Sequence, residues 1–270
     1  MDGRQRFRDR TALAAVALLA LFVPSLQAAD GLSGAWTSAG TGVQTYVFKV
    51  QGDRFTGILC GPCDDAAAVF RIEDGKILDA DRLTFSINYD LGGPEFKKYG
   101  SYRAQVTATR SGNQWAVRTQ RQGGTEPPIT DVLKRVVGNY AGLSMTSAGT
   151  GTSVRAAESR PSPIEGKWVA AGRVTQQNFI LKVRDNTVWG LVCGPCNPEG
   201  VFMIDDGKVD GNALTFYINH IDTPPSTGRT GLSRNIMRGA LTGNVMKFKW
   251  VREGAENEPG GEMVLIGPIR

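Results

Sequence analysis

Two copies of the motif Cys-Gly-Pro-Cys contain all the cysteines of this 270-residue chain. The first copy holds Cys60 and Cys63, and the second holds Cys193 and Cys196. Cysteines at this spacing can carry out thiol–disulfide exchange, can share a zinc ion with a second such pair, or can form a disulfide across a tight turn. The residues around the motifs must distinguish these three chemistries.

Redox catalysis of the thioredoxin type needs its first cysteine at the start of a helix, where the helix dipole stabilises the thiolate. Here each motif follows an apolar run typical of a strand, and the next strand begins only a few residues later. Pro198 and Gly200 would also disrupt a helix after the second motif. The setting therefore disfavours redox catalysis, which we keep as an alternative.

A zinc site would combine the four thiolates of both motifs, so it would require the two halves of the chain to face each other. A disulfide requires only a turn, because residues i and i+3 of a β-turn lie within about 7 Å and a disulfide spans that distance. Gly-Pro favours such a turn. We therefore expect Cys60–Cys63 and Cys193–Cys196 disulfides and no cofactor, with a zinc site as the alternative.

The N-terminus predicts export, which favours oxidised cysteines. Four arginines between residues 4 and 10 precede an unbroken apolar run over residues 12–23, and small residues follow at Ala28 and Ala29. This is the layout of a signal peptide, here residues 1–28 with cleavage near Ala28, and the run is too short to cross a bilayer. We expect a periplasmic or extracellular protein without a membrane span.

The charge balance is mild. Removing residues 1–28 lowers the formal net charge from +5 to +3, because the segment carries four arginines and two aspartates. A net charge this small, from charges this scattered, does not favour nucleic acid as a partner.

The chain is a tandem duplication. Trp36 corresponds to Trp168 and Cys60 to Cys193, and the offset between matching residues stays between 131 and 133. The repeats cover residues 31–136 and 164–270, and residues 137–163, rich in Gly, Ser, Thr and Ala, read as a flexible linker.

Within each repeat the apolar residues alternate with a period of two, as in Thr45–Val50 and Asn178–Val183. Turn sequences separate the runs, and no run has a helical stripe of useful length. The pattern predicts an all-β protein of two tandem antiparallel up-and-down barrels with about eight strands each. The segments EDGK and DDGK, with Glu73-Asp74 and Asp205-Asp206, are interpreted as hairpin turns.

Each repeat opens with Gly-x-Trp, at Trp36 and Trp168, and ends with a basic residue, Arg135 or Arg270. This resembles the calycin pattern of lipocalins and avidins, and it is similar to modules of many exported bacterial proteins. The resemblance implies that a first-strand Trp packs at the barrel floor under an Arg of the last strand. Trp36 with Arg135, and Trp168 with Arg270, are then structural barrel-closure residues.

The sequence offers few candidate catalytic residues. His220 is the only histidine, and its counterpart in the first repeat is Tyr89. The loops after these two residues are long and differ in sequence, and loops on a rigid scaffold are where binding usually occurs. We expect an exported, non-enzymatic binding or interaction protein, with a small apolar ligand or a protein as partner. A thiol–disulfide or zinc protein is the alternative.

Overall fold

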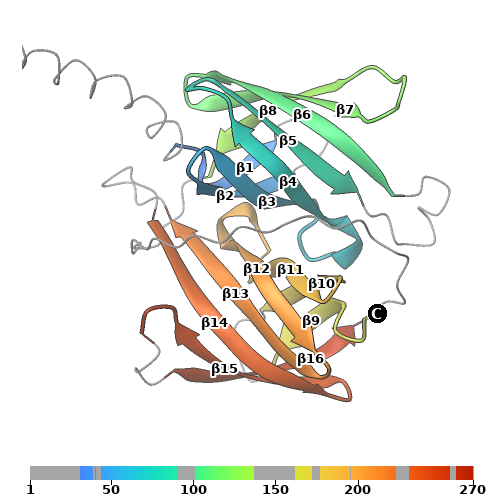
Figure 1. Ribbon diagram of the computed structural model, residues 1–270, viewed down its shortest axis with the longest axis vertical. Coiled ribbons are helices and arrows are strands. Elements are labelled where there is room, and N and C mark those ends of the chain that lie inside the picture. The colour runs from blue at the N-terminus through green and yellow to red at the C-terminus, as the bar shows by residue number, and fades with distance from the viewer. Residues whose placement is uncertain are drawn as a thin grey trace, which may run out of the picture.

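The computed structural model describes residues 31–38, 40, 44–89, 101–136, 162–171, 177–194, 196–222, 231–255 and 260–269. These residues form two closed antiparallel β-barrels of eight strands each, as the period-two pattern predicts (Figure 1). The predicted signal peptide, most of the predicted linker and the two long loops at 90–100 and 223–230 lie outside the described residues.

Barrel 1 is built from consecutive strands that each pair with the next. They are β1 (Gly34–Ser38), β2 (Thr45–Gln51), β3 (Arg54–Cys60), β4 (Val69–Ile77), β5 (Arg82–Tyr89), β6 (Tyr102–Ser111), β7 (Gln114–Arg121) and β8 (Ile129–Arg135). Pairing of β1 with β8 closes the barrel and places Trp36 opposite Arg135. Closure leaves no unpaired sheet edge.

Barrel 2 repeats this order. Its strands are β9 (Gly166–Ala170), β10 (Asn178–Arg184), β11 (Thr187–Cys193), β12 (Val201–Asp210), β13 (Ala213–Asp222), β14 (Gly231–Thr242), β15 (Val245–Arg252) and β16 (Gly261–Ile269). Pairing of β16 with β9 closes it. Short 3-10 helices, η1 (Ala66–Ala68) and η3 (Pro198–Gly200), lie between the cysteine motifs and the following strands. No helix among the described residues is long and apolar enough to cross a membrane.

The interpretation of EDGK and DDGK as hairpin turns is wrong. Both segments lie inside long strands, β4 and β12, where the register shifts at a bulge after Glu73 and after Asp205. Asp74 and Asp206 adopt positive φ angles of 54° and 49° there. A bulge bends a strand sharply, as a small closed barrel requires, and the local sequence for such a bend resembles that of a turn.

Side chains fill the barrel interiors. In barrel 1 the rings of Phe48, Phe55 and Phe85 pack edge to face with centroids 5.3 to 5.7 Å apart. In barrel 2 Phe216 and Phe248 meet in the same way at 5.2 Å. Such contacts add to the stabilisation from apolar burial. Among the described residues, the barrel interiors are therefore occupied by packed side chains.

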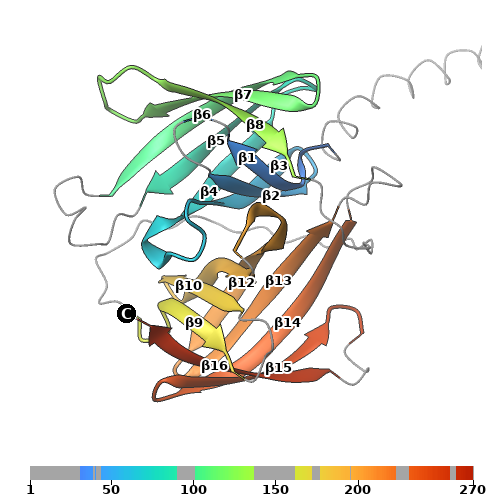
Figure 2. The same ribbon diagram turned by 180° about the vertical axis from the view of Figure 1, so that it is seen from behind.

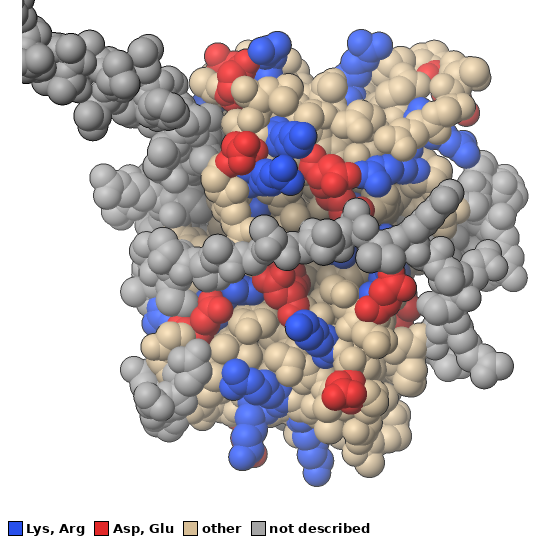
Figure 3. Space-filling model, in the orientation of Figure 1, with Lys and Arg blue, Asp and Glu red and all other residues tan. Residues whose placement is uncertain are grey.

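The two barrels are stacked, with β2, β3 and β4 of barrel 1 turned toward β10, β11 and β12 of barrel 2 (Figures 1 and 2). The loops that follow β3 and β11, which carry the two cysteine motifs, lie between the barrels in both views. Acidic and basic side chains are interspersed over both barrels on the face shown in Figure 3.

Candidate functional site

The cysteines are paired within each motif. Cys60 ends β3 and is bonded to Cys63, and Cys193 ends β11 and is bonded to Cys196. The Cα atoms are 4.8 and 4.7 Å apart, a separation that disulfides commonly span. Both predicted disulfides are confirmed by this pairing.

The two disulfides lie at the interface between the barrels. Cys60 and Cys193 are fully buried, and Cys63 is 5% exposed. The Cys193 Sγ lies 3.7 Å from the carbonyl oxygen of Cys63 in the other barrel. The face-to-face arrangement that a shared zinc site would need is therefore present, but each sulfur is bonded to its neighbour in the same motif. No cluster of three or more metal-ligating side chains occurs among the described residues.

An apolar cluster surrounds the disulfides and joins the barrels. Its buried members are Val47, Ile58, Cys60, Cys63, Val69, Ile180, Trp189, Leu191, Cys193, Val201 and Met203. Several equivalent positions of the two repeats contribute, since Val47 corresponds to Ile180 and Ile58 to Leu191, whereas Trp189 and Met203 are contributed by barrel 2 alone. The interface therefore has the approximate two-fold character of a contact between identical surfaces.

A network of charges seals one side of this interface. Lys49 of barrel 1 is 4% exposed, and its Nζ lies 2.6 Å from Asp205 and 3.3 Å from Asp206 of barrel 2. Arg234 also binds both carboxylates, and it pairs with Glu253 at 3.2 Å. Burial alone would raise the pKa of Asp206, but the charges of Lys49 and Arg234 outweigh it and lower the pKa.

Sequence reasoning missed this network because the two aspartates were interpreted as part of a turn. The bulge in β12 turns both carboxylates toward barrel 1, and only the docked arrangement places Lys49 beside them. In the first repeat, the equivalent Asp74 binds Arg103 of its own barrel. The signal available in the sequence was the acidic pair followed by Gly, which occurs in both repeats.

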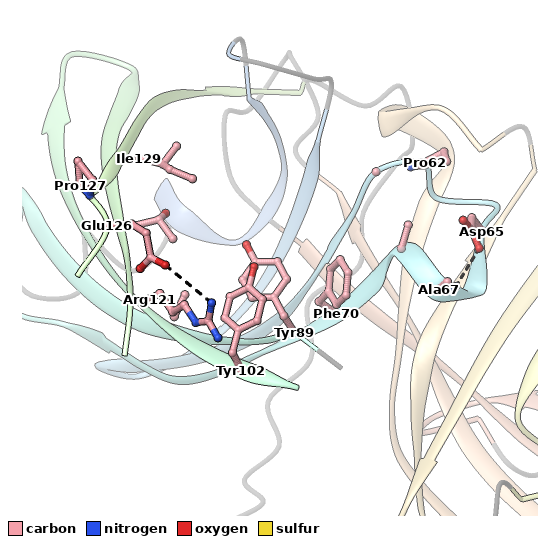
Figure 4. A pocket seen from close by; sticks show the side chains of 14 residues that line it. Pro62, Asp65, Ala67, Phe70, Tyr89, Tyr102, Arg121, Glu126, Pro127 and Ile129 are labelled. Carbon is pink, nitrogen blue, oxygen red and sulfur yellow. Dashed lines mark hydrogen bonds and ion pairs between the residues drawn. The ribbon is translucent and has the colours of Figure 1, made fainter. Parts of the chain in front are cut away.

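A pocket of about 600 Å³ opens at the mouth of barrel 1, beside the first cysteine motif (Figure 4). Its walls come from the loop after β3, from β4 to β7 and from the segment leading into β8. They consist of Gly61, Pro62, Asp65, Ala67, Ala68, Phe70, Tyr89, Tyr102, Ala104, Thr119, Arg121, Glu126, Pro127 and Ile129. Its volume is in the range of small-molecule sites.

Aromatic rings form one continuous wall of this pocket. Phe70 packs against Tyr89 with centroids 4.8 Å apart, and Tyr89 stacks on Tyr102 at 4.7 Å and 18°. Burial raises the pKa of both tyrosines, with the neighbouring Tyr46 and Tyr102 contributing for Tyr89. The tyrosines therefore stay neutral at physiological pH, and the wall is uncharged.

Arg121 is the positive group of the pocket. Its guanidinium carbon lies 4.8 Å from the centroid of the Tyr102 ring, within cation–π range. Its ion-pair partner among the described residues is Glu126, with the N–O distance at 4.0 Å. In Figure 4 Asp65 lies at the far, loop end of the pocket, where its carboxylate accepts a hydrogen bond from the Ala67 backbone N–H at 2.9 Å.

Barrel 2 has different residues at the positions equivalent to the pocket lining of barrel 1. Thr119 faces Ile129 across β7 and β8, whereas the equivalent pair in barrel 2 is Trp250 and Gly261. The Trp250 indole packs against the barrel 2 core and occupies the space beside Gly261, where a Cβ would lie 2.3 Å from Nε1. One exchange of a small residue for Trp therefore fills a volume that stays open in barrel 1.

The aromatic wall is also replaced in barrel 2. His220 takes the place of Tyr89, and it packs on Phe202 with centroids 4.5 Å apart. Its Nε2 lies 3.2 Å from the amide nitrogen of Asn235, which replaces Ala104. Burial lowers the pKa of His220, so the imidazole is held neutral. The described part of this mouth is more polar than that of barrel 1.

Trp36, Arg135 and Trp168, three of the four residues assigned to barrel closure, lie among the described residues. The Arg135 guanidinium lies 5.4 Å from the Trp36 ring centroid and donates hydrogen bonds to the carbonyl oxygens of Gly31 and Ser33. The indole N–H groups of Trp36 and Trp168 each donate to the carbonyl oxygen four residues earlier, at 2.8 Å. Arg270 lies outside the described residues.

Compared with models of known protein families and with curated proteins, the sequence matches none. The architecture of two closed eight-stranded barrels therefore rests on the structure itself, and the likeness to calycins stays a resemblance.

Proposed function

We propose that this chain is an exported, non-enzymatic binding protein whose first barrel takes a small, mainly apolar ligand at its mouth. The second barrel packs against the cysteine loop beside that mouth and holds the loop in place. Export is supported by the N-terminal sequence and by the paired cysteines, which persist in oxidising compartments. The observation that carries the proposal is the pocket of barrel 1 with its wall of Phe70, Tyr89 and Tyr102.

The chemistry of the lining supports binding rather than catalysis. The lining residues include no histidine, cysteine, serine or lysine. This set therefore contains no Ser–His or Cys–His pair of the kind that activates a nucleophile. The aromatic wall instead offers the extended apolar surface that small-molecule sites use for affinity.

The first disulfide supports the pocket from behind. Gly61 and Pro62, between the bonded cysteines, line the pocket, while Cys60 and Cys63 pack into the interface with barrel 2. The loop thus has one side toward the ligand space and the other toward the second barrel. In this proposal the disulfides are structural, and each one fixes the conformation of its loop.

The test uses N-phenyl-1-naphthylamine, a neutral apolar fluorophore that brightens in apolar sites. The whole mature protein should show saturable 1:1 binding. Thr119→Trp, which installs the residue found in barrel 2, should abolish it by filling the pocket. Ala116→Trp, an exposed position on the outer face of the same strand, is the matched control and should bind as the unmodified protein does. Undiminished binding by Thr119→Trp would refute the proposal.

A further inference from the structure

We infer that the natural ligand of the barrel 1 pocket is an amphipathic anion, with a flat aromatic body and a single carboxylate or similar acidic group. This inference rests on the proposed function, because it concerns the occupant of the same pocket. It assigns the body of the ligand to the aromatic wall and the acidic group to Arg121. No other basic side chain is among the lining residues described.

The aromatic wall favours a flat body. The rings of Tyr89 and Tyr102 are nearly parallel in their stack, at 18°, and the tilted ring of Phe70 extends the aromatic wall toward the cysteine loop. Ala67, Ala68 and Ala104 add small side chains to the lining beside these rings. A planar ring can pack against the edges of these rings and gain both apolar burial and edge-to-face aromatic contacts.

Arg121 favours an acidic group beside that body. The guanidinium is held over the Tyr102 ring, and this contact uses its face and leaves its N–H edge free for a ligand. Among the described residues it donates no hydrogen bond, and its pairing with Glu126 is long, with both side chains substantially exposed. A carboxylate can accept two parallel hydrogen bonds from such an edge.

The two acidic side chains of the lining do not reverse this preference. The Asp65 carboxylate is engaged at the start of η1 and lies at the other end of the pocket from Arg121 (Figure 4). Glu126 is 64% exposed, so it can turn into solvent when a ligand carboxylate takes its place. Water screens an exposed ion pair of this kind, and its loss costs little.

The same position in barrel 2 provides a control. Arg252 is equivalent to Arg121, as each pairs across the sheet with the residue at the Ala104 or Asn235 position. In barrel 2 the tyrosine counterparts are His220 and Ser233, and Trp250 fills the neighbouring space. Arginine alone is therefore not the distinguishing feature, since in the part of the chain that the structure describes the aromatic wall and the pocket accompany Arg121 and not Arg252.

The experiment compares three probes with the same body at pH 7 by titration calorimetry: 2-naphthoate, neutral 2-naphthamide and 2-naphthylmethylammonium. The mature protein should bind 2-naphthoate about tenfold or more tightly than 2-naphthamide, the difference expected for hydrogen bonds to a charged group. Arg121→Gln should remove this preference while changing 2-naphthamide binding less than about twofold. Arg121→Lys should keep part of it, since the charge remains but the planar fork is lost.

Two further variants sharpen the test. Arg252→Gln should leave all three affinities unchanged, and Glu126→Gln should strengthen 2-naphthoate binding by removing the competing carboxylate. Equal binding of 2-naphthoate and 2-naphthamide, or tighter binding of the cation, would overturn the inference while leaving the proposed pocket intact if Thr119→Trp still blocks them. Failure of all three probes and of N-phenyl-1-naphthylamine would instead overturn the proposed function itself.

Discussion

Replacing Lys49 by Met should weaken the contact between the barrels more than any other single charge removal at this interface. The side chain of Lys49 is 5% exposed and that of Asp205 is 14% exposed, with 2.6 Å between Nζ and the carboxylate. Met keeps most of the volume of the lysine stem, so the change removes the charge and the hydrogen bonds with little loss of packing.

The size of the expected loss of stability depends on the partners that Asp205 retains after Lys49 is replaced. Breaking a buried ion pair costs about 3–5 kcal/mol when the remaining charge is left alone. Asp205 retains Arg234 at 3.4 Å and a hydrogen bond from the Asn219 side-chain N–H at 2.8 Å. Asp206 is 59% exposed, so its pairing with Lys49 adds little. We therefore expect a loss of about 2–3 kcal/mol in the free energy of unfolding.

Urea denaturation of the oxidised protein, followed by tryptophan fluorescence, measures this loss. The matched control is Lys182→Met, the equivalent position in barrel 2, where the ammonium pairs with Glu165 of its own barrel at 3.9 Å. It should cost less than about 1 kcal/mol. The double variant with Asp205→Asn should show a coupling energy of at least about 1 kcal/mol. A change below about 0.5 kcal/mol for Lys49→Met, or equal losses for both lysines, would refute the reasoning.

Three other measurements test separate parts of the structure. The intact mass of the protein purified without reductant should be lowered by the hydrogens of two disulfides; a native mass raised by one zinc ion, with four alkylatable thiols, would contradict the pairing. The Cys60→Ala/Cys63→Ala variant should lose about 2 kcal/mol of stability, the chain-entropy value for so short a loop, and a loss of naphthylamine binding should accompany it. Burial lowers the pKa of His220, so below about pH 6.5 the unfolded chain binds a proton more readily than the folded chain does. The contribution of neutral His220 to the free energy of unfolding should therefore be present above pH 6.5 and should decrease as the pH falls below that value. His220→Asn should flatten this dependence in denaturation measured between about pH 7 and pH 5, and an unchanged slope would show that other groups cause it.

The duplicated barrels share equivalent apolar residues in their interface and differ more strongly at their mouths. Equivalent residues such as Val47 and Ile180 meet in the interface. At the mouths, by contrast, Thr119 in one copy corresponds to Trp250 in the other. This division suits a protein in which one copy binds and both copies hold the structure together.

The sequence by itself indicated the fold class and the duplication, and it favoured the two disulfides over a zinc site or redox catalysis. A period of two over many short runs leaves a β-structure as the arrangement that buries one face of each run, and consecutive hairpins lead to closed barrels. The disulfides followed from spacing, because residues i and i+3 of a tight turn are always close. The period of two and the spacing of the cysteines are local properties, so they can be found in the sequence without knowledge of the tertiary structure.

The tertiary structure alone decided the interface, the charge network and the pocket. Lys49 and Asp205 are 156 residues apart, and nothing in either local pattern marks them as partners. The bulges at Asp74 and Asp206 have the composition of turns, and only barrel closure makes them bends within a strand. Whether a barrel mouth is open depends on cross-strand pairs such as Trp250 and Gly261, and that register is fixed by the packing of the whole barrel rather than by either residue.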